Sequence, residues 1–225
     1  DGPKVATHAI AAPRIALVHT WTSTQNEGWF RLGLETSGIP YAYISDQKLR
    51  EWGNLRERFD VIVFGPVQGT SQRVVNGMPM RGEAIAWKAG ELTPNLATSP
   101  DQTDDMRGGM GLAGLLNVQK FVEEGGLFVT VGGNASIPID YGLVEGVSVT
   151  PVRELKARGS VLDSVVADAK SPIVYGYGER LPVYFNSTPI LEVSAGGAFG
   201  GAHGSSGQAN RWRTSRPRRT LRQTR

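Results

Sequence analysis

The stretch LAGLLNVQKFVEEGGLFVTV, residues 112–131, decides the fold of this chain. Leucine, valine and phenylalanine recur at helical spacing over residues 112–122, and Gly125-Gly126 end the predicted helix. The apolar run 127–131 follows at once and is typical of a strand buried on both faces. A helix that leads directly into a buried strand is the repeating unit of a parallel α/β sheet.

Three earlier runs extend the same pattern toward the N-terminus. Residues 14–19 (RIALVH), 41–44 (YAYI) and 60–64 (DVIVF) are short and apolar, and helices that begin at Asn26 and Asp46 separate them. The candidates for capping the later helix are Thr103, Asp104 and Asp105. Because right-handed crossovers place helices on both faces, we expect a doubly wound, three-layer α/β sandwich with a mainly parallel sheet. Ligands of such sheets bind beyond the carboxyl ends of the strands.

The chain divides into a linker at 1–12, one domain at 13–194 and a tail at 195–225. Within the domain, residues 66–104 are rich in Gly, Pro, Ser, Thr and Asn, and we expect a mobile insertion there. The Gly/Arg-rich tail has almost no residues that could form a core, so we expect disorder. Short β-like runs in the second half lie at 147–152, 160–166, 173–175, 183–186 and 190–193.

The composition excludes several kinds of site. The 225 residues include no cysteine, so the chain has no disulfide, no thiolate metal ligand and no thiol nucleophile. No run approaches the roughly 20 apolar residues that cross a bilayer, and no signal peptide is visible. Because the first residue is Asp1 and no such apolar run is present, we expect a soluble piece of a longer precursor or polyprotein that does not contact a membrane.

The net charge of +3 arises in the tail. Seven arginines lie between Arg211 and Arg225 without an acid, whereas the rest of the chain has 17 basic and 21 acidic residues. Such a tail can bind nucleic acid or an acidic surface, with Trp212 as a stacking residue. A shifted GC-rich reading frame produces the same composition, and we do not favour a nucleic-acid partner.

The expected carboxyl edge of the sheet holds three candidate clusters. They are 19–21 (HTW) after the first strand, 65–67 (GPV) after the third and 132–136 (GGNAS) after the fourth. Small residues surround Ser136 in the turn GGNAS (132–136), as in the nucleophile elbow that presents a side chain above a sheet. A serine nucleophile needs a histidine base, and His8 and His203 lie outside the predicted fold. The residues predicted to bind a ligand are His19, Thr20, Trp21, Asn134 and Ser136.

Structural roles compete with these assignments. An imidazole at a strand end, such as His19, is commonly satisfied by a backbone carbonyl, and Trp21 and Trp29 are more typical of packing residues. His19 has no second histidine or glutamate at metal-binding spacing, so no metal ligand is assigned. No catalytic residue is assigned either.

A separate anion site is predicted where the long helix begins. Arg107, Gly108 and Gly109 could offer free backbone N–H groups together with a positive charge. Asp104 and Asp105 already provide negative charge at this end, which is the simpler reason for its composition.

Long segments of the chain resemble the C-terminal region of bacterial zinc carboxypeptidases of the carboxypeptidase A type. These segments span residues 13–194 and include RIALVHTWTSTQNEGWFRLGLE, YAYISDQKLRE, FDVIVFGPV, DDMRGGMGLAGLLNVQKFVEEGGLFVTVGG, IDYGLVEGV, LKARGSVLDSVVAD and SPIVYGYGERLPVYFN. In that family, a zinc-binding peptidase domain precedes a class I glutamine amidotransferase-like domain with a flavodoxin-like sheet. The family's zinc-binding HxxE motif and later histidine have no counterpart here, and the elbow cysteine of amidotransferases would fall at Gly132 or Gly133.

The resemblance implies a non-catalytic accessory domain of a secreted or periplasmic zinc metallocarboxypeptidase. Its partners would be the zinc-dependent peptidase domain, absent from this chain, and peptide or cell-wall substrate. One alternative is a small-ligand binding domain that uses the carboxyl edge. The other is a serine hydrolase that uses Ser136.

Overall fold

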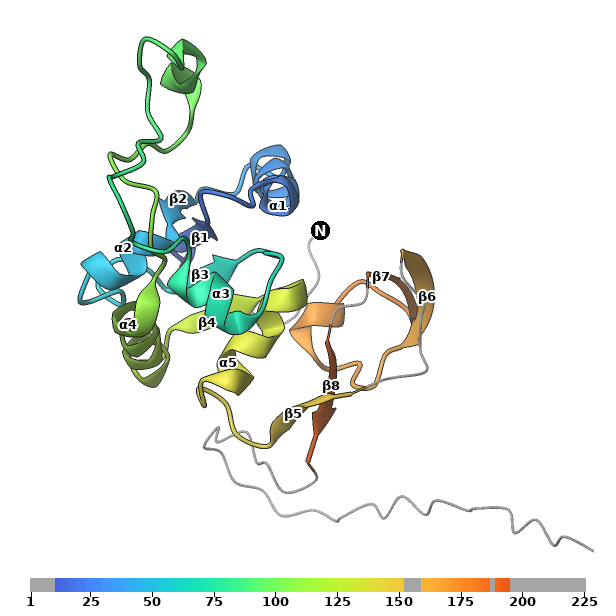
Figure 1. Ribbon diagram of the computed structural model, residues 1–225. Coiled ribbons are helices and arrows are strands. Elements are labelled where there is room, and N and C mark those ends of the chain that lie inside the picture. The colour runs from blue at the N-terminus through green and yellow to red at the C-terminus, as the bar shows by residue number, and fades with distance from the viewer. Residues whose placement is uncertain (1–10, 152–158, 187–188, 195–225) are drawn as a thin grey trace, which may run out of the picture.

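A four-stranded parallel sheet forms the centre of the computed structural model, which describes residues 11–151, 159–186 and 189–194. The strands stand in the order β2-β1-β3-β4 (Figure 1). Their bounds are β1 (Ile15–His19), β2 (Ala42–Ser45), β3 (Val61–Phe64) and β4 (Leu127–Thr130). The chain is therefore an α/β protein with helices flanking a parallel sheet, compatible with a flavodoxin-like layout.

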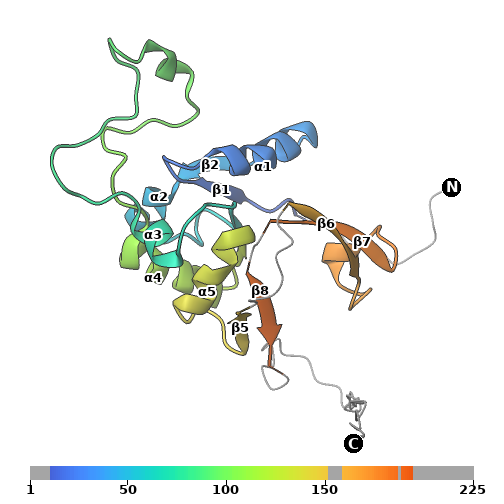
Figure 2. The ribbon, with the colours of Figure 1, turned by 45° about the vertical axis from the view of Figure 1, so that its right-hand side comes forward.

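The helices cover the two faces of the sheet unequally. Helix α1 (Gln25–Thr36) lies on one face, and α2 (Asp46–Glu51) and α4 (Gly111–Glu123) pack together on the other (Figure 2). The chain steps from β1 to β2 in one direction and from β2 through β3 to β4 in the other. Because these crossovers are right-handed, the helix that connects β1 to β2 lies on one face, and the helices that connect β2 to β3 and β3 to β4 lie on the other.

The main core lies between the sheet and the pair α2 and α4. Leu49 of α2 and Phe121 of α4 are buried there against Ile62 and Phe64 of β3. The opposite face differs from the prediction, because Trp29 and Leu32 of α1 are 69% and 52% exposed. The expectation that Trp29 is a packing residue is therefore wrong, since no described residue covers most of its side chain.

The long helix begins later than its sequence suggests. Helix α4 starts at Gly111 with Met110 at the N-cap, so Thr103, Asp104 and Asp105 do not cap it. Gly108 and Gly111 have φ values of +71° and +59°, left-handed conformations that interrupt a regular helix, so the regular turns of α4 come after them. In α1, similarly, Thr24 rather than Asn26 is at the N-cap.

Residues 66–104, predicted as a mobile insertion, contain regular structure. They include α3 (Ser71–Asn76) and the 3₁₀ helix η1 (Pro94–Thr98). The green segment in Figure 1 projects from the sheet, and Trp87 and Thr103 form an antiparallel bridge across it. We call residues 79–107 the projecting segment; its base is closed where the Gly108 amide donates to the Met78 carbonyl over 2.7 Å.

The second half adds two antiparallel strand pairs to the sheet domain. After β4 come the 3₁₀ turn η2 (Gly132–Ser136) and the short helix α5 (Ile137–Asp140). The run 173–175, predicted as β-like, lies in a 3₁₀ turn instead, because Pro172 favours the helical start. The remaining elements are β5 (Val147–Thr150) paired with β8 (Ile190–Val193), β6 (Ser160–Val165) paired with β7 (Arg180–Phe185), and η3 (Pro172–Val174). The predicted tail and residues 1–10 of the linker lie outside the described residues.

Candidate functional site

The carboxyl edge of the sheet contains a crevice between β1 and β3. The connections from these neighbouring strands leave in opposite directions, toward β2 and β4. Ligands of open α/β sheets bind at such a switch point. Two cavities open here, of about 870 and 910 Å³.

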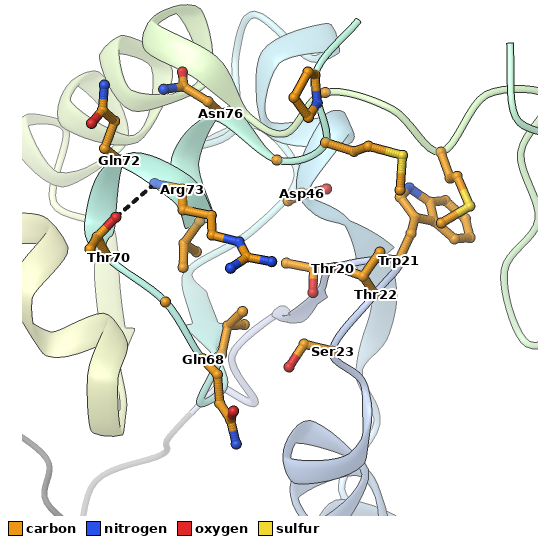
Figure 3. Close-up of a pocket in the computed structure, with 18 residues that line it drawn as sticks. Thr20, Trp21, Thr22, Ser23, Asp46, Gln68, Thr70, Gln72, Arg73 and Asn76 are labelled. Atoms are coloured by element: carbon orange, nitrogen blue, oxygen red, sulfur yellow. Dashed lines mark hydrogen bonds between the residues drawn. The ribbon is translucent and has the colours of Figure 1, made fainter. Parts of the chain in front are cut away.

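We call the first cavity the edge pocket. Thr20–Ser23 after β1 and Val67–Thr70 after β3 form two of its walls, and α3 contributes Arg73 (Figure 3). Asp46, directly after β2, lines the same pocket. Arg73 and Asp46 are the charged residues among its described lining, so the pocket offers one cationic and one acidic group.

Two polar side chains of the edge pocket are buried without a hydrogen-bond partner. Asp46 is 2% exposed, and its Oδ1 atom accepts no hydrogen bond from the described residues. Burial raises the pKa of the Asp46 carboxyl to about 7. Thr20 is 7% exposed, and its Oγ1 atom likewise has no partner there. Unpaired buried polar atoms cost stability, so a donor that reached these two atoms would be stabilising.

We call the second cavity the elbow cavity. It lies between α1, the loop after β3 and the turn Gly132–Ser136, with Tyr184 of β7 at its side. Gly132 has a φ of +63°, the left-handed conformation that suits a tight turn after a strand. Asn134 is buried and its Nδ2 atom donates to the Gly65 carbonyl, which ties this turn to the end of β3.

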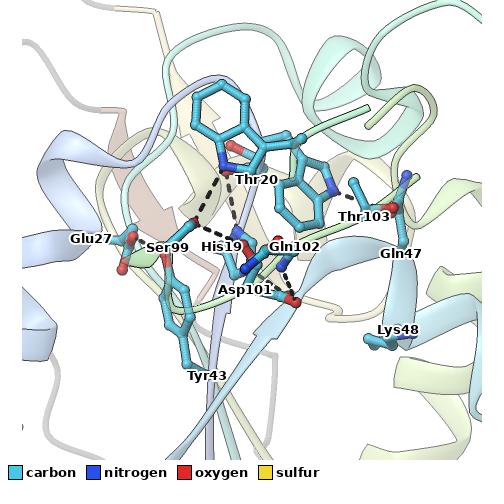
Figure 4. A network of polar contacts seen from close by, with 12 residues as sticks. His19, Thr20, Glu27, Tyr43, Gln47, Lys48, Ser99, Asp101, Gln102 and Thr103 are labelled. Carbon is cyan, nitrogen blue, oxygen red and sulfur yellow. Dashed lines mark hydrogen bonds and ion pairs between the residues drawn. The ribbon is translucent and has the colours of Figure 1, made fainter. Parts of the chain in front are cut away.

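His19 belongs to a buried polar network at the end of β1. Its Nε2 atom lies 3.0 Å from Oδ2 of Asp101, which comes from the projecting segment (Figure 4). Its ring stacks on Tyr43 at 4.2 Å and meets the edge of Trp21 at 4.8 Å. The Thr20 carbonyl lies 3.3 Å from Nδ1, so the expected backbone contact is present. The contact with Asp101 was not foreseen, because the sequence suggested a flexible segment there.

The network continues from Tyr43 into α1. The Tyr43 hydroxyl donates to Oε1 of Glu27 over 2.6 Å, and Glu27 is only 2% exposed. Burial raises the pKa of the Glu27 carboxyl. The aromatic and acidic side chains of β1, β2 and α1 thus hold the projecting segment against the sheet edge through Asp101.

The five residues predicted to bind a ligand do not share one cavity. Thr20 and Trp21 line the edge pocket, and the Trp21 indole donates to Oε1 of Gln47 over 3.1 Å. Ser136 lines the elbow cavity. The remaining two, His19 and Asn134, lie in the network and the turn described above. Sequence reasoning missed Asp46 and Arg73 of the edge pocket.

The predicted anion site is occupied by local contacts. The Arg107 guanidinium forms two hydrogen bonds of 2.8 Å with the Asp105 carboxylate and donates to two backbone carbonyls. These bonds hold the pKa of the Asp105 carboxyl well below its usual range. Gly108 lines the edge pocket, and the Gly109 carbonyl accepts from Arg50 over 2.9 Å. Arg107 therefore already has a carboxylate partner in place of an external anion.

Metal and membrane features can be examined only in the described ranges. Residues 11–151, 159–186 and 189–194 contain no group of three or more His, Asp or Glu side chains that could hold a metal ion. None of the helices seen in these ranges has the length and apolar character needed to cross a membrane. The chain matches no protein-family model, curated protein or solved structure.

The network makes a prediction about how the projecting segment is held. We expect Asp101→Ala to lower the free energy of unfolding by about 1–3 kcal/mol, because it leaves the buried His19 Nε2 atom unpaired. The matched control is Asp104→Ala, since Asp104 is 85% exposed in its side chain and pairs with Lys88 at the surface. Such a pair contributes about 0–1 kcal/mol. Urea denaturation measures both, and equal losses would contradict the prediction.

Proposed function

We propose that this chain is a non-catalytic accessory domain of a secreted or periplasmic zinc carboxypeptidase, with a flavodoxin-like, amidotransferase-like fold. The strand order β2-β1-β3-β4 and the edge cavities support that fold. The peptidase domain that precedes it in the parent protein would hold the zinc and perform the proteolysis. This chain would orient that domain or help it recognise peptide or cell-wall substrate.

One observation carries the proposal. The turn Gly132–Ser136 has the tight, left-handed start of a nucleophile elbow, but the position of the nucleophile has no reactive side chain. Gly132 comes two residues after the end of β4, has a φ of +63° and lines the elbow cavity. An amidotransferase places its cysteine in such a turn. Here Gly132 and Gly133 offer no side chain, and the chain has no cysteine.

The remaining serine of the turn has no base beside it. Ser136 lines the elbow cavity, whereas His19 lines a separate pocket of about 160 Å³ and is engaged by Asp101. A serine hydrolase therefore lacks the base that a nucleophilic hydroxyl needs, as far as the described residues go. Labelling of Ser136 by a fluorophosphonate would revive that alternative.

The exposed face of α1 supports an accessory role. Trp29 and Leu32 of α1 are 69% and 52% exposed, so this helix presents apolar surface outward. Exposed apolar groups gather where a protein contacts another surface. The peptidase domain of the parent is the partner that we propose for this face.

The parent gene tests the accessory role directly. We expect the DNA upstream of Asp1 to encode a zinc-binding HxxE motif and a later histidine. With the whole protein in hand, removing residues 13–194 should lower kcat/KM on peptide substrates while the isolated chain shows no turnover. Glutaminase, esterase or peptidase activity of the isolated chain would refute the proposal.

A single introduced thiol tests whether the elbow is catalytically inert. We expect Gly132→Cys to create a thiol with the reactivity of an ordinary exposed cysteine toward iodoacetamide, because no histidine of the described residues lines the elbow cavity. Ala97→Cys, at an exposed site in η1, is the reference thiol. The rate constants, measured across pH, should agree within a few-fold. A much faster reaction at Gly132→Cys near neutral pH would indicate a preserved activating environment.

A ligand-binding domain is the second candidate function, and the edge pocket favours it. Asp46 and Thr20 keep buried, unpaired oxygen atoms at the switch point of the sheet. This function is compatible with an accessory role, since a domain that binds a small molecule can assist a neighbouring enzyme. A thermal-shift screen that finds no stabilising ligand would count against it.

A further inference from the structure

The guanidinium of Arg73 is available to a ligand in the edge pocket. Its side chain extends from α3 across the pocket toward Thr20 (Figure 3). The stem lies against Gly69, where an added Cβ atom would be 3.4 Å from Cδ of Arg73. Among the described residues, no carboxylate lies within ion-pair distance of this guanidinium. Helix α3 therefore positions a cation that no carboxylate of the described residues neutralises.

Asp46 and Thr20 provide the opposite kind of group. Both side chains are more than nine-tenths buried, both line the edge pocket, and each has an oxygen atom without a partner. In its ionised form, the Asp46 carboxylate only accepts hydrogen bonds and therefore requires a donor or a cation. The hydroxyl of Thr20 can accept from the same donor.

We infer that the edge pocket binds a small zwitterion, whose carboxylate pairs with Arg73 and whose ammonium group lies against Asp46 and Thr20. A ligand with one charge would leave either the cation or the buried acid unpaired. A phosphate ester fits poorly, because Arg73 is the only cation of the described lining and Asp46 would repel a second negative charge. Trp21, Met78 and Met106 add apolar surface for a short carbon chain.

The inference rests on the proposed function, in which this edge binds molecules and does not transform them. Calorimetric titration of the full chain is the test. Its probes are L-alanine, β-alanine and γ-aminobutyrate, which differ in the separation of their charges. Propionate and propylamine carry one charge each. We expect at least one zwitterion to bind about tenfold or more tightly than either one-charge molecule.

Three substitutions locate the binding site. Arg73→Met keeps the stem and should weaken zwitterion binding about tenfold or more, as should Asp46→Asn. Thr20→Val, which keeps the shape, should weaken it a few-fold. Arg58→Met is the matched control, because Arg58 is exposed, stacks on Trp52 and does not line the edge pocket. The Arg58→Met variant should bind the zwitterion with the same affinity as the unaltered chain.

Several outcomes would overturn the inference. They are the failure of all three zwitterions to bind, binding of propionate as tight as the best zwitterion, and unchanged affinity in Arg73→Met. NMR shows whether a bound zwitterion is chemically converted, and this result separates the non-catalytic function from the zwitterion site. Conversion of a bound zwitterion would refute the non-catalytic function and leave the site intact, whereas absent binding without turnover refutes the site alone.

Discussion

Asp46→Asn should make the protein markedly more stable at pH 8 and only slightly more stable at pH 4. Burial raises the pKa of the Asp46 carboxyl from 3.8 to about 7. Each pKa unit corresponds to ~1.4 kcal/mol, so the ionised carboxylate costs the folded state on the order of 4 kcal/mol. Asparagine has nearly the same shape and no charge to desolvate.

The pH range of this effect follows from the direction of the pKa shift. The unfolded chain releases the Asp46 proton near pH 4, whereas the folded chain retains it until about pH 7. The unfolded state therefore binds fewer protons between these values, and the stability of the unaltered protein falls as the pH rises through this interval. The difference between Asp46→Asn and the unaltered protein should grow from about pH 4 to 7 and then stay constant.

Urea denaturation at several pH values measures this difference. Asp104→Asn is the control, because its side chain is 85% exposed and its removal should give a small difference without this pH profile. A stability difference for Asp46→Asn that does not change between pH 4 and 8 would contradict the prediction. The substitution has a further use, since a variant that is more stable and binds zwitterions less well cannot owe its lost affinity to unfolding.

The strands were predictable from sequence because each forms a continuous apolar run. The expected burial on both faces holds for β1 but is wrong for β4, an edge strand in which Leu127 is 57% exposed and the other residues are half-buried. The runs 60–64 and 127–131 differ from β3 and β4 by one residue at one end. Helix α1 was less predictable on its exposed face. Its apolar residues suggested a buried stripe, yet Trp29 stays exposed, and helical spacing alone does not say whether a partner covers it.

The sequence predicted where the candidate site lies in the fold, but not all of the residues that form it. The rule that ligands bind at the carboxyl edge pointed to Thr20 and Trp21, and the same rule applied to the strand 42–45 would have pointed to Asp46. Arg73 and Asp101 gave no such signal, because they lie in a segment of weak periodicity. Asp101 meets His19 across 82 residues of chain, and a contact at that separation is set by tertiary packing.

Gly77→Ala should cost about 3 kcal/mol or more of folding free energy, because two backbones cross at this glycine. Gly77 ends α3 with φ 61° and ψ −150°, a conformation that is essentially restricted to glycine. An added Cβ atom would lie 2.6 Å from the carbonyl carbon of Gly108 and 2.7 Å from the amide nitrogen of Gly109. These are backbone atoms and cannot rotate away, so overpacking of ~1–3 kcal/mol adds to backbone strain of ~1–3 kcal/mol.

Gly82→Ala separates the close approach from the positive φ. Gly82 has a φ of +74°, but an added Cβ atom there would have no neighbour within 4 Å. We expect it to cost only about 1–2 kcal/mol, the penalty for the left-handed backbone. If urea denaturation gave the same loss of folding free energy for Gly77→Ala and Gly82→Ala, the backbones at Gly77 and Gly108 would not be in tight contact. Because Gly77 and Gly108 also line the edge pocket, Gly77→Ala should weaken zwitterion binding, whereas Gly82→Ala should leave it unchanged.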